Sequence, residues 1–406
     1  MLLDFTVTNF RSFKDRNTFS MEKGSARRYK SNVFSVGNKK LLKSAVIFGG
    51  NANGKTNMLT ALIALQVQIL APFLKSDTFS YNKDDTTFEI NFIKDALTFN
   101  YTLSYNDTEI VEENLYIDNK IFFKRNKQKF DVLPENLKVV QSNIRKEQNL
   151  LYFAMENNIK EAAIAVSWFV EDLIFINTDE GYLDNRIFKL LENDSIKDKF
   201  LKFLQAADFN IIDVEVKERV VDTPDFNFTI DYDGEGILRN VKSGHKITKQ
   251  KIYDVYSKHK SQSGNFEVHY LNESAGTKIF MIIAMYILQN ENSNKIILID
   301  EFDKSFHLEL AQALLDVINS ENQKNQFIMT SHQPSLMDYK LRQEQIYLVE
   351  KNQYGESEIF SIYDFDDPAI TRGDFGYMKR YLQGRFGATQ IINKSLLLSI
   401  LEDDHA

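Results

Sequence analysis

Three short runs of the chain, at residues 45–48, 296–299 and 327–330, are almost wholly apolar. Such runs are typical of strands in a parallel sheet, because helices cover both faces of that sheet and exclude water from it. Longer apolar patterns at 58–69 and 279–288 predict helices. Strands and helices that alternate in this way predict an α/β fold.

Between these elements the pattern changes twice. Residues 87–130 form alternating segments separated by turn-like Asn106-Asp107 and Asp118-Asn119-Lys120, which predicts an antiparallel β meander. The pattern then becomes helical, and the clearest helices are expected at 143–155 and 162–175.

These patterns divide the chain into four predicted parts. The expected division is an N-terminal lobe with the meander at 1–136, a helical insertion at 137–210, a C-terminal lobe at 211–365 that opens with strands at 211–221 and 226–231, and a C-terminal tail at 366–406. The sequence has no repeat and no sustained heptads, so a long coiled-coil arm is not expected.

The run at 45–48 leads into a glycine-rich loop that opens the helical pattern at 58–69. The loop is Gly49-Gly50-Asn51-Ala52-Asn53-Gly54-Lys55-Thr56. Between a strand and a helix, glycines let N–H groups converge on a phosphate, Lys55 adds a positive charge, and the Thr56 hydroxyl is placed to ligate Mg²⁺. We expect a nucleoside triphosphate in this loop. The alternative is a glycine turn before an ordinary helix.

The run at 296–299 ends in two carboxylates, Asp300 and Glu301. Ligands of open α/β sheets bind at the carboxyl ends of the strands. Asp300 is placed to hold hydrated Mg²⁺, and Glu301 to take a proton from an attacking water. A solvated strand end or a helix cap also explains an isolated pair. Together with a phosphate loop in the same chain, the pair is typical of a Walker B motif.

Two further polar elements lie beside apolar segments. Residues 273–278, Glu-Ser-Ala-Gly-Thr-Lys, precede the helix expected at 279–288. Ser274 and Gly276 are placed there to bind a second anion or, alternatively, to cap the helix. His332 follows the run at 327–330, where it is placed to hydrogen-bond a γ-phosphate or to serve a structural role.

The order of phosphate loop, Ser-x-Gly-Thr loop, Asp-Glu and His resembles the ABC-type P-loop ATPase head. The resemblance implies ATP and Mg²⁺ as cofactors and Glu301 and His332 as catalytic residues. It also implies that the signature loop at 274–277 contacts the γ-phosphate held by another subunit, in an ATP-dependent dimer or higher oligomer. Residues 9–13, Asn-Phe-Arg-Ser-Phe, are similar to the opening strand of the SMC, RecF and OLD-like branch, where the arginine equivalent to Arg11 approaches the nucleotide.

Weaker patterns resemble the AAA/ABC-type ATPases of abortive-infection and restriction-linked loci, the AbiL- and RloA-like proteins. The shared features are residues 88–90, the run 113–125, the signature, and the tail at 381–388. Residues 303–307 occupy the D-loop position. The signature reads Glu-Ser-Ala-Gly-Thr, which departs from the transporter form Leu-Ser-Gly-Gly-Gln. The Q-loop glutamine stays open among Gln66, Gln68 and Gln141.

Composition narrows the class of protein. The 406 residues are 43% hydrophobic and 26% charged, enough to bury a large core. The absence of cysteine excludes disulfides, thiolate zinc sites and a cysteine nucleophile. The first residues do not resemble a signal peptide, and no apolar run approaches the length of a membrane span. A cytoplasmic protein without membrane association is therefore expected.

Charge gives weaker guidance on partners. The formal net charge of −8 argues against a protein that coats nucleic acid by charge alone. Residues 239–260 are nonetheless rich in lysine and contain two interleaved tyrosines. This segment is either a nucleic-acid contact arm or the solvated face of a hairpin or helix.

Too few residues follow His332 for a separate nuclease domain once strands expected at 345–363 are counted, so we expect an effector to act in trans. The leading hypothesis is an oligomeric ATP-dependent switch that controls a separately encoded toxin or nuclease, such as a Toprim-like enzyme, in anti-phage defence, with a phage-encoded trigger. The alternative is a DNA-repair or chromosome-associated ATPase that clamps DNA directly.

The C-terminal tail has two interpretations. With Tyr381, Leu382, Arg385 and Phe386, it is either a docking element for the partner or a helix packed on its own head.

Overall fold

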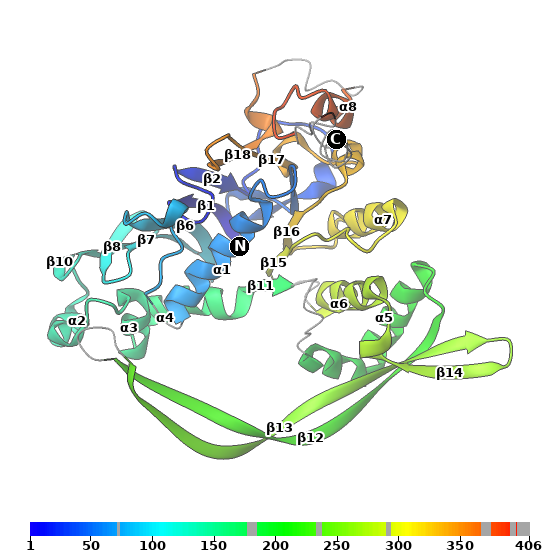
Figure 1. Cartoon of the computed structure of the whole chain (residues 1–406), viewed down its shortest axis with the longest axis horizontal. Helices are drawn as coiled ribbons and strands as arrows, with labels where there is room; N and C mark the ends of the chain where they lie inside the picture. Colours follow the sequence, from blue (N-terminus) through cyan, green and yellow to red (C-terminus); the bar gives the residue numbers. More distant parts are fainter. Residues whose placement is uncertain are drawn as a thin grey trace, which may run out of the picture. The chain divides into compact units, whose positions relative to one another are not determined.

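The chain forms two compact units in the computed structural model, which describes residues 1–70, 74–176, 185–232, 238–289, 294–366, 375–389 and 395 (Figure 1). The first unit contains residues 1–178 and 290–406, and the second contains residues 179–289. The predicted α/β fold is confirmed, because both units combine helices with sheets.

An antiparallel sheet forms one part of the first unit. Its order is β10-β9-β8-β7-β6-β1-β2, and all of its pairings are antiparallel. The strands are β1 (Leu2–Thr8), β2 (Asn17–Ser20), β6 (Thr86–Lys94), β7 (Leu97–Tyr105), β8 (Ile110–Ile117), β9 (Lys120–Asn126) and β10 (Lys129–Val132). The predicted meander at 87–130 is therefore confirmed, and it extends a sheet that begins at the N-terminal strand.

The second sheet of this unit is mainly parallel and has the order β11-β15-β16-β5-β17-β18. The pairings from β11 to β17 are parallel, and only β17–β18 is antiparallel. The strands are β5 (Ser44–Phe48), β11 (Leu173–Ile176), β15 (Ile296–Ile299), β16 (Gln326–Thr330), β17 (Ile346–Lys351) and β18 (Ser357–Ser361). All three apolar runs are strands, as predicted, and they lie side by side in this sheet as β15, β16 and β5.

Helices and a small hairpin complete the first unit. They are α1 (Lys55–Leu70), α2 (Glu135–Lys138), α3 (Leu150–Glu156), α4 (Lys160–Ser167), α7 (Leu308–Ile318), α8 (Tyr377–Leu382), and the paired strands β3 (Val33–Val36) and β4 (Lys39–Leu42). Buried side chains of α1 join residues of both large sheets in one continuous apolar core. Helix α1 therefore has its N-terminus fixed against the parallel sheet, where β5 ends.

The predicted helix at 162–175 is correct only in part. Helix α4 is followed by one π-helical turn, Trp168–Asp172, and then by strand β11. Trp168 is fully buried and stacks on Phe92 with ring centroids 4.6 Å apart. Residues 173–176 are a strand because they pair in parallel with β15, a long-range contact that a local helical pattern does not contain.

The second unit contains the remaining strands and helices. They are the 3₁₀-helix Asn185–Glu192, α5 (Asp194–Ala206), β12 (Ile211–Tyr232), β13 (Leu238–Ser261), β14 (Gly264–His269) and α6 (Ala275–Gln289). Helix α5 is capped by Asn193, whose side chain accepts from the N–H groups of Ser195 and Ile196. Phe203 and Phe209, at and after the end of α5, pack against Phe280 of α6.

The predicted boundaries of the helical insertion differ from the structure. Helices α3 and α4 contribute to the core of the first unit, whereas the second unit continues through β12, β13 and β14 to the end of α6. The two strands expected at 211–221 and 226–231 are one strand, because pairing with β13 continues through Pro224. Strand β12 is an edge strand, where a proline without an N–H group is tolerated.

A buried ion pair attaches the meander to α3. Glu113 on β8 and Arg125 on β9 are fully buried, 3.5 Å apart, and burial raises the pKa of Glu113 above its usual range. The Glu113 carboxylate accepts from the N–H groups of Leu150 (2.6 Å) and Leu151 (2.8 Å) at the start of α3. The Glu113–Arg125 run noted in the sequence therefore supports the fold of the first unit.

Removal of the Glu113 carboxylate is expected to destabilise the first unit, because the buried Arg125 charge loses its counter-ion and the N–H groups of Leu150 and Leu151 lose their acceptor. We expect Glu113→Ala to lower the free energy of unfolding by about 3–5 kcal/mol in urea titrations. Glu135→Ala is the matched control, since the Glu135 side chain is 84% exposed and its ion pair with Lys138 is solvated. A cost below about 1 kcal/mol for Glu113→Ala would show that the buried pair is dispensable.

Candidate nucleotide-binding site

The glycine-rich loop connects the end of β5 to the first residue of α1, as predicted. Gly54 has a φ of +110°, and a Cβ atom there would lie 2.7 Å from both the Ser12 and Ser357 hydroxyl oxygens. A Cβ atom on Gly49 would lie 2.5 Å from the carbonyl oxygen of Val349 on β17. The neighbouring backbone and hydroxyls therefore leave room for glycine alone at these two positions.

Lys55 lies inside this loop. Its ammonium group donates to the carbonyl oxygens of Gly49 (2.9 Å) and Gly50 (3.1 Å). Burial lowers the pKa of Lys55, and the coulombic effect of Asp300 and Glu301 opposes that shift. The ammonium is thus held where the N-terminal end of α1 attracts anions, in a position to exchange a carbonyl partner for a phosphate oxygen.

Thr56 and Asp300 meet across the sheet edge. The Thr56 hydroxyl lies 3.1 and 2.9 Å from the two carboxylate oxygens of Asp300. Thr330, at the end of β16, donates its hydroxyl to Asp300 at 2.5 Å and accepts from the backbone N–H of Glu301 at 2.7 Å. One threonine hydroxyl therefore orients both members of the Asp-Glu pair. Sequence reasoning missed Thr330, although it ends one of the three apolar runs.

The donor set fits a magnesium ion that is shared with a nucleotide. A hydroxyl and a carboxylate are oxygen ligands, and Mg²⁺ takes one or two protein ligands together with phosphates and waters. Within the described ranges no group of three histidine, aspartate or glutamate side chains is placed to hold a metal by itself. Thr56 and Asp300 are the residues that would hold Mg²⁺ here.

Glu301 occupies a constrained position beside His332. Its φ is +48°, an unfavourable conformation for a residue with a side chain, and such conformations concentrate at functional sites. Its carboxylate lies 3.3 Å from His332 Nε2 and 2.8 Å from the ammonium of Lys304. The structure therefore brings together Lys55, Thr56, Asp300, Glu301 and His332, which were predicted from motifs far apart in the sequence.

Asp303 supports this edge from below the surface. It is 2% exposed, accepts from the Ser331 hydroxyl at 2.9 Å, and burial raises its pKa. Ser331 also accepts from the backbone N–H of Gln333 at 3.0 Å. These contacts fix the backbone on both sides of His332.

The Arg11 guanidinium pairs with the carboxylate of Asp77 at 2.7 Å. The adjacent residue, Ser12, lies against the phosphate loop and accepts from the side-chain amide of Asn57 at 2.8 Å. Asn51 is exposed, and Asn53 donates to the Val349 carbonyl at 3.1 Å. Nucleotide contacts of Arg11, Asn51 and Asn53 stay predictions.

The predicted signature lies in the second unit, at the start of α6. The Ser274 hydroxyl lies 2.8 Å from that of Thr277 and accepts from the Thr277 N–H at 3.1 Å, as a helix cap does. Glu273, which is buried, lies 2.7 Å from His259 on β13. Gly276 is half-buried on the first turn of this helix. The helix-cap interpretation is confirmed, and contact with a nucleotide of another subunit stays a prediction.

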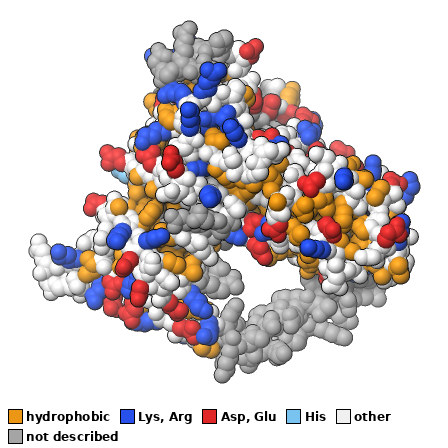
Figure 2. Space-filling model, turned by 180° about the vertical axis from the view of Figure 1, so that it is seen from behind, with side chains coloured by type: hydrophobic (Ala, Val, Ile, Leu, Met, Phe, Trp, Pro, Cys, Tyr) orange, Lys and Arg blue, Asp and Glu red, His pale blue; other side chains and the backbone are white. Residues whose placement is uncertain are grey.

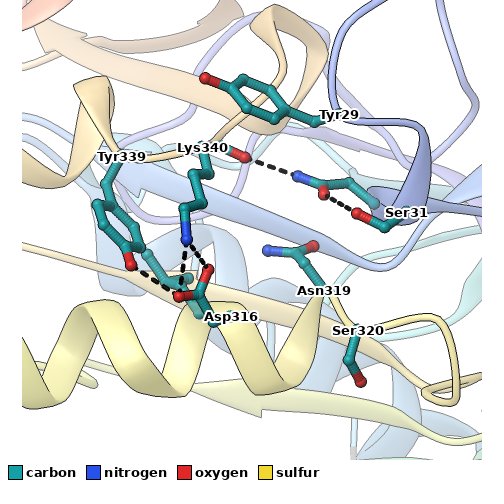
Figure 3. A pocket seen from close by; sticks show the side chains of 9 residues that line it. Tyr29, Ser31, Asp316, Asn319, Ser320, Tyr339 and Lys340 are labelled. Atoms are coloured by element: carbon teal, nitrogen blue, oxygen red, sulfur yellow. Dashed lines mark hydrogen bonds and ion pairs between the residues drawn. The ribbon is translucent and has the colours of Figure 1, made fainter.

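A small polar cavity lies between α7 and the segment around Lys340 (Figure 3). Its volume is about 120 Å³, and none of its lining residues belongs to the glycine loop or to the Asp300–Glu301 edge. The carboxylate of Asp316 binds the Lys340 ammonium at 2.9 Å and accepts from the Tyr339 hydroxyl at 2.7 Å. Asp316 thus satisfies Lys340 and Tyr339 within the cavity, and the lining residues are distinct from those of the candidate nucleotide site.

A family model matches residues 44–338, which span the phosphate loop, the Asp-Glu pair and His332. Its description is "AAA domain, putative AbiEii toxin, Type IV TA system". The chain belongs to this AAA-domain family. The prediction of an AAA-type ATPase is thereby confirmed at the level of the family, and the AbiL- and RloA-like branch stays a prediction. No curated protein matches the chain.

Solved structures of SMC heads are similar at low sequence identity. The SMC head domain from Thermotoga maritima is 13% identical, with a TM-score of 0.42, and the match covers 89% of this chain and 98% of that one. An SMC head bound to the C-terminal winged-helix domain of ScpA is 12% identical, with a TM-score of 0.46 and coverage of 89% and 97%. An Smc head with an extended coiled coil, bound to the C-terminal domain of ScpA derived from Pyrococcus furiosus, is 12% identical, with a TM-score of 0.44 and coverage of 89% and 96%. Separately, none of the described helices has the length and apolarity to cross a membrane.

The Thr330 hydroxyl should control magnesium affinity, because it orients the carboxylate that would ligate the ion. We expect Thr330→Val to raise the Mg²⁺ concentration for half-maximal ATP hydrolysis about 10–100-fold, as loss of an outer-shell partner does. Thr330→Ser keeps the hydroxyl and should remain near wild type. Equal Mg²⁺ dependence of the two variants would remove Thr330 from this role.

Proposed function

We propose that this protein is an ATP-binding and ATP-hydrolysing switch that controls a separately encoded effector in anti-phage defence. The observation that carries the nucleotide part is the meeting of Thr56 with Asp300, beside Lys55 and Glu301, at the carboxyl edge of the parallel sheet. The description of the matching family, with its toxin and Type IV TA system, supports the defence part.

In the proposed reaction, residues of this chain bind the nucleotide, orient a water molecule and stabilise the charge on the phosphates. The loop N–H groups and Lys55 would bind the triphosphate, and the Thr56 hydroxyl and Asp300 would hold the magnesium ion. Bound Mg²⁺ would neutralise charge on the β- and γ-phosphates. Glu301 would orient a water molecule and accept its proton. His332, whose Nε2 lies 3.3 Å from the Glu301 carboxylate, would hydrogen-bond the terminal phosphate.

Direct DNA clamping is the alternative, and the charges of the second unit give it little support. Lys251 on β13 pairs with Glu218 at 2.8 Å, and Arg219 on β12 pairs with Asp254 at 3.0 Å. Basic and acidic side chains are also interspersed among the described residues on the face drawn in Figure 2. The lysine side chains at 242–249 lie outside the described side chains. In the part of the β12–β13 hairpin whose side chains are described, acidic residues thus balance the positive charge of the basic ones.

The effector proposal is tested with the neighbouring gene. Co-expression of the two proteins should give a complex that co-purifies and protects cells from phage, and Lys55→Ala should abolish protection while leaving the protein folded. Protection that persists with Lys55→Ala would refute a nucleotide-driven switch. Tight binding of DNA by the isolated protein, with no complex formed, would favour the clamp.

Two substitutions should separate nucleotide binding from hydrolysis. Lys55→Ala removes a charge that binds the phosphates in the ground state and the transition state, so we expect weakened ATP binding. Glu301→Gln removes the proton acceptor, so we expect near-normal ATP binding with kcat lowered about 10²–10⁴-fold. Equilibrium binding and single-turnover hydrolysis measure the two effects. Wild-type turnover of Glu301→Gln would exclude Glu301 as the base.

Mixing two inactive variants should test whether the site is shared between subunits. If Ser274 acts on the partner's nucleotide, a Ser274→Arg chain paired with a Glu301→Gln chain forms one site with both lesions and one intact site. Random pairing should then restore about a quarter of wild-type ATPase activity. Lys55→Ala mixed with Glu301→Gln is the control, because both lesions lie on the same side of the site and no intact site forms. Equal inactivity of the two mixtures would count against a shared site.

A further inference from the structure

The C-terminal segment at 375–389 is a built part of the first unit. We call it the C-terminal clasp. Asp338 caps its helix α8 by accepting from the N–H groups of Tyr377 (2.6 Å) and Met378 (3.3 Å). Phe386 is 5% exposed and packs on Phe365 with ring centroids 5.3 Å apart. The clasp is therefore anchored by a cap at one end and an aromatic contact at the other.

This burial corrects the prediction that Tyr381 and Phe386 are anchors for a partner. Tyr381 is 6% exposed and Phe386 is 5% exposed, so both face the interior of the unit. Leu382 is 63% exposed and Arg385 is also exposed. The interpretation of the tail as a helix packed on its own head is the one that the described residues support.

The clasp ends on the phosphate loop. The carbonyl oxygen of Ala388 accepts from the backbone N–H of Gly50 at 3.2 Å and from the Tyr381 hydroxyl at 3.0 Å. Gly50 in turn holds the Lys55 ammonium through its own carbonyl at 3.1 Å. A continuous chain of hydrogen bonds therefore runs from Tyr381, through Ala388 and Gly50, to the lysine that would bind phosphate.

The sequence of the clasp fits this contact closely. Gly384 and Gly387 have φ values of +73° and +67°, and the carbonyl of Gly384 accepts from the N–H of Gly387. A Cβ atom on Gly387 would lie 2.5 Å from the Glu350 carboxylate. Ala388 itself has a φ of +56° and is fully buried. A strained alanine persists only where its surroundings hold it, and here they direct its carbonyl at the phosphate loop.

We propose that the C-terminal clasp positions the phosphate loop for nucleotide, with Tyr381 as the positioning residue. The proposal rests on the proposed ATP site. By fixing the peptide that carries Gly50, the clasp keeps the Lys55 end of the loop in a binding geometry before ATP arrives, which lowers the ordering cost of binding. Coupling of this kind is reciprocal, so bound ATP must also stabilise the clasp.

Tyr381→Phe tests the proposal, because it removes only the hydroxyl that holds the Ala388 carbonyl. We expect the Kd for ATP to rise about three- to tenfold, which is the effect of one hydrogen bond. In amide hydrogen exchange, peptides that contain Gly50 should exchange faster than in the wild type. ATP should slow exchange in residues 377–388 of the wild type and do so less in the variant.

Tyr347→Phe is the matched control. Tyr347 is also buried, and its hydroxyl donates to the backbone carbonyl of Ser20 at 3.0 Å, away from the loop. It should lower the melting temperature without changing exchange at Gly50 or the affinity for ATP. Unchanged exchange at Gly50 and unchanged ATP affinity in Tyr381→Phe would overturn the proposal, as would equal effects of the two variants.

A second pair of variants separates the contact from backbone strain. Gly387→Ala and Gly384→Ala both place a side chain at a positive φ, but only the first meets the Glu350 carboxylate. We expect Gly387→Ala to accelerate exchange at Gly50 more than Gly384→Ala, and the reverse order would contradict the clasp. If the wild type fails to bind ATP, the ATPase proposal fails, while the exchange measured at Gly50 without nucleotide still decides whether the clasp holds the loop.

Discussion

The contact of Thr56 with Asp300, reinforced by the Thr330 hydroxyl, is the interaction on which the proposed site depends. It joins the start of α1 to the ends of β15 and β16. Parallel pairing makes this contact available, because the five parallel strands of the sheet all present their carboxyl ends at the same edge. These strands are β11, β15, β16, β5 and β17. Polar side chains that follow separate apolar runs therefore lie together at this edge. The Thr330 hydroxyl also accepts from the backbone N–H of Glu301 and so fixes the position of that residue.

Much of this arrangement could be predicted because it is encoded locally. The largely apolar sequences of β5, β15 and β16 mark strands that are buried on both faces, and the residue after each strand is then expected at the ligand edge. The glycine loop is also local, since its geometry needs glycine at particular positions. The sequence did not reveal which side chains support the carboxylate of Asp300 and the glycine loop. Thr330, Ser12 and Ser357 look ordinary in isolation, and only the fold places them against Asp300 and Gly54.

Contacts between residues far apart in the sequence also explain where the predictions from the sequence failed. Residues 173–176 have apolar side chains that suit a helix, yet an open edge of the parallel sheet recruits them as β11. The carboxylate of Glu113 looks like a surface charge by composition, yet it caps α3 from inside the core. In the tail, Tyr381 and Phe386 resemble interface residues because aromatic side chains suit both interfaces and interiors, and burial alone distinguishes the two uses.

The separation of Thr56 and Asp300 by 244 positions along the chain has a consequence for biosynthesis. At about 5–20 residues per second, roughly 10–50 s pass between translation of the glycine loop and translation of its carboxylate partner. Strand β5 also waits for both of its neighbours, β16 and β17, which come later still. A chain that is still being synthesised therefore lacks the carboxylate that the proposed magnesium site needs. Under the proposed function, newly made protein stays inactive until β16 and β17 have been translated and the parallel sheet has formed.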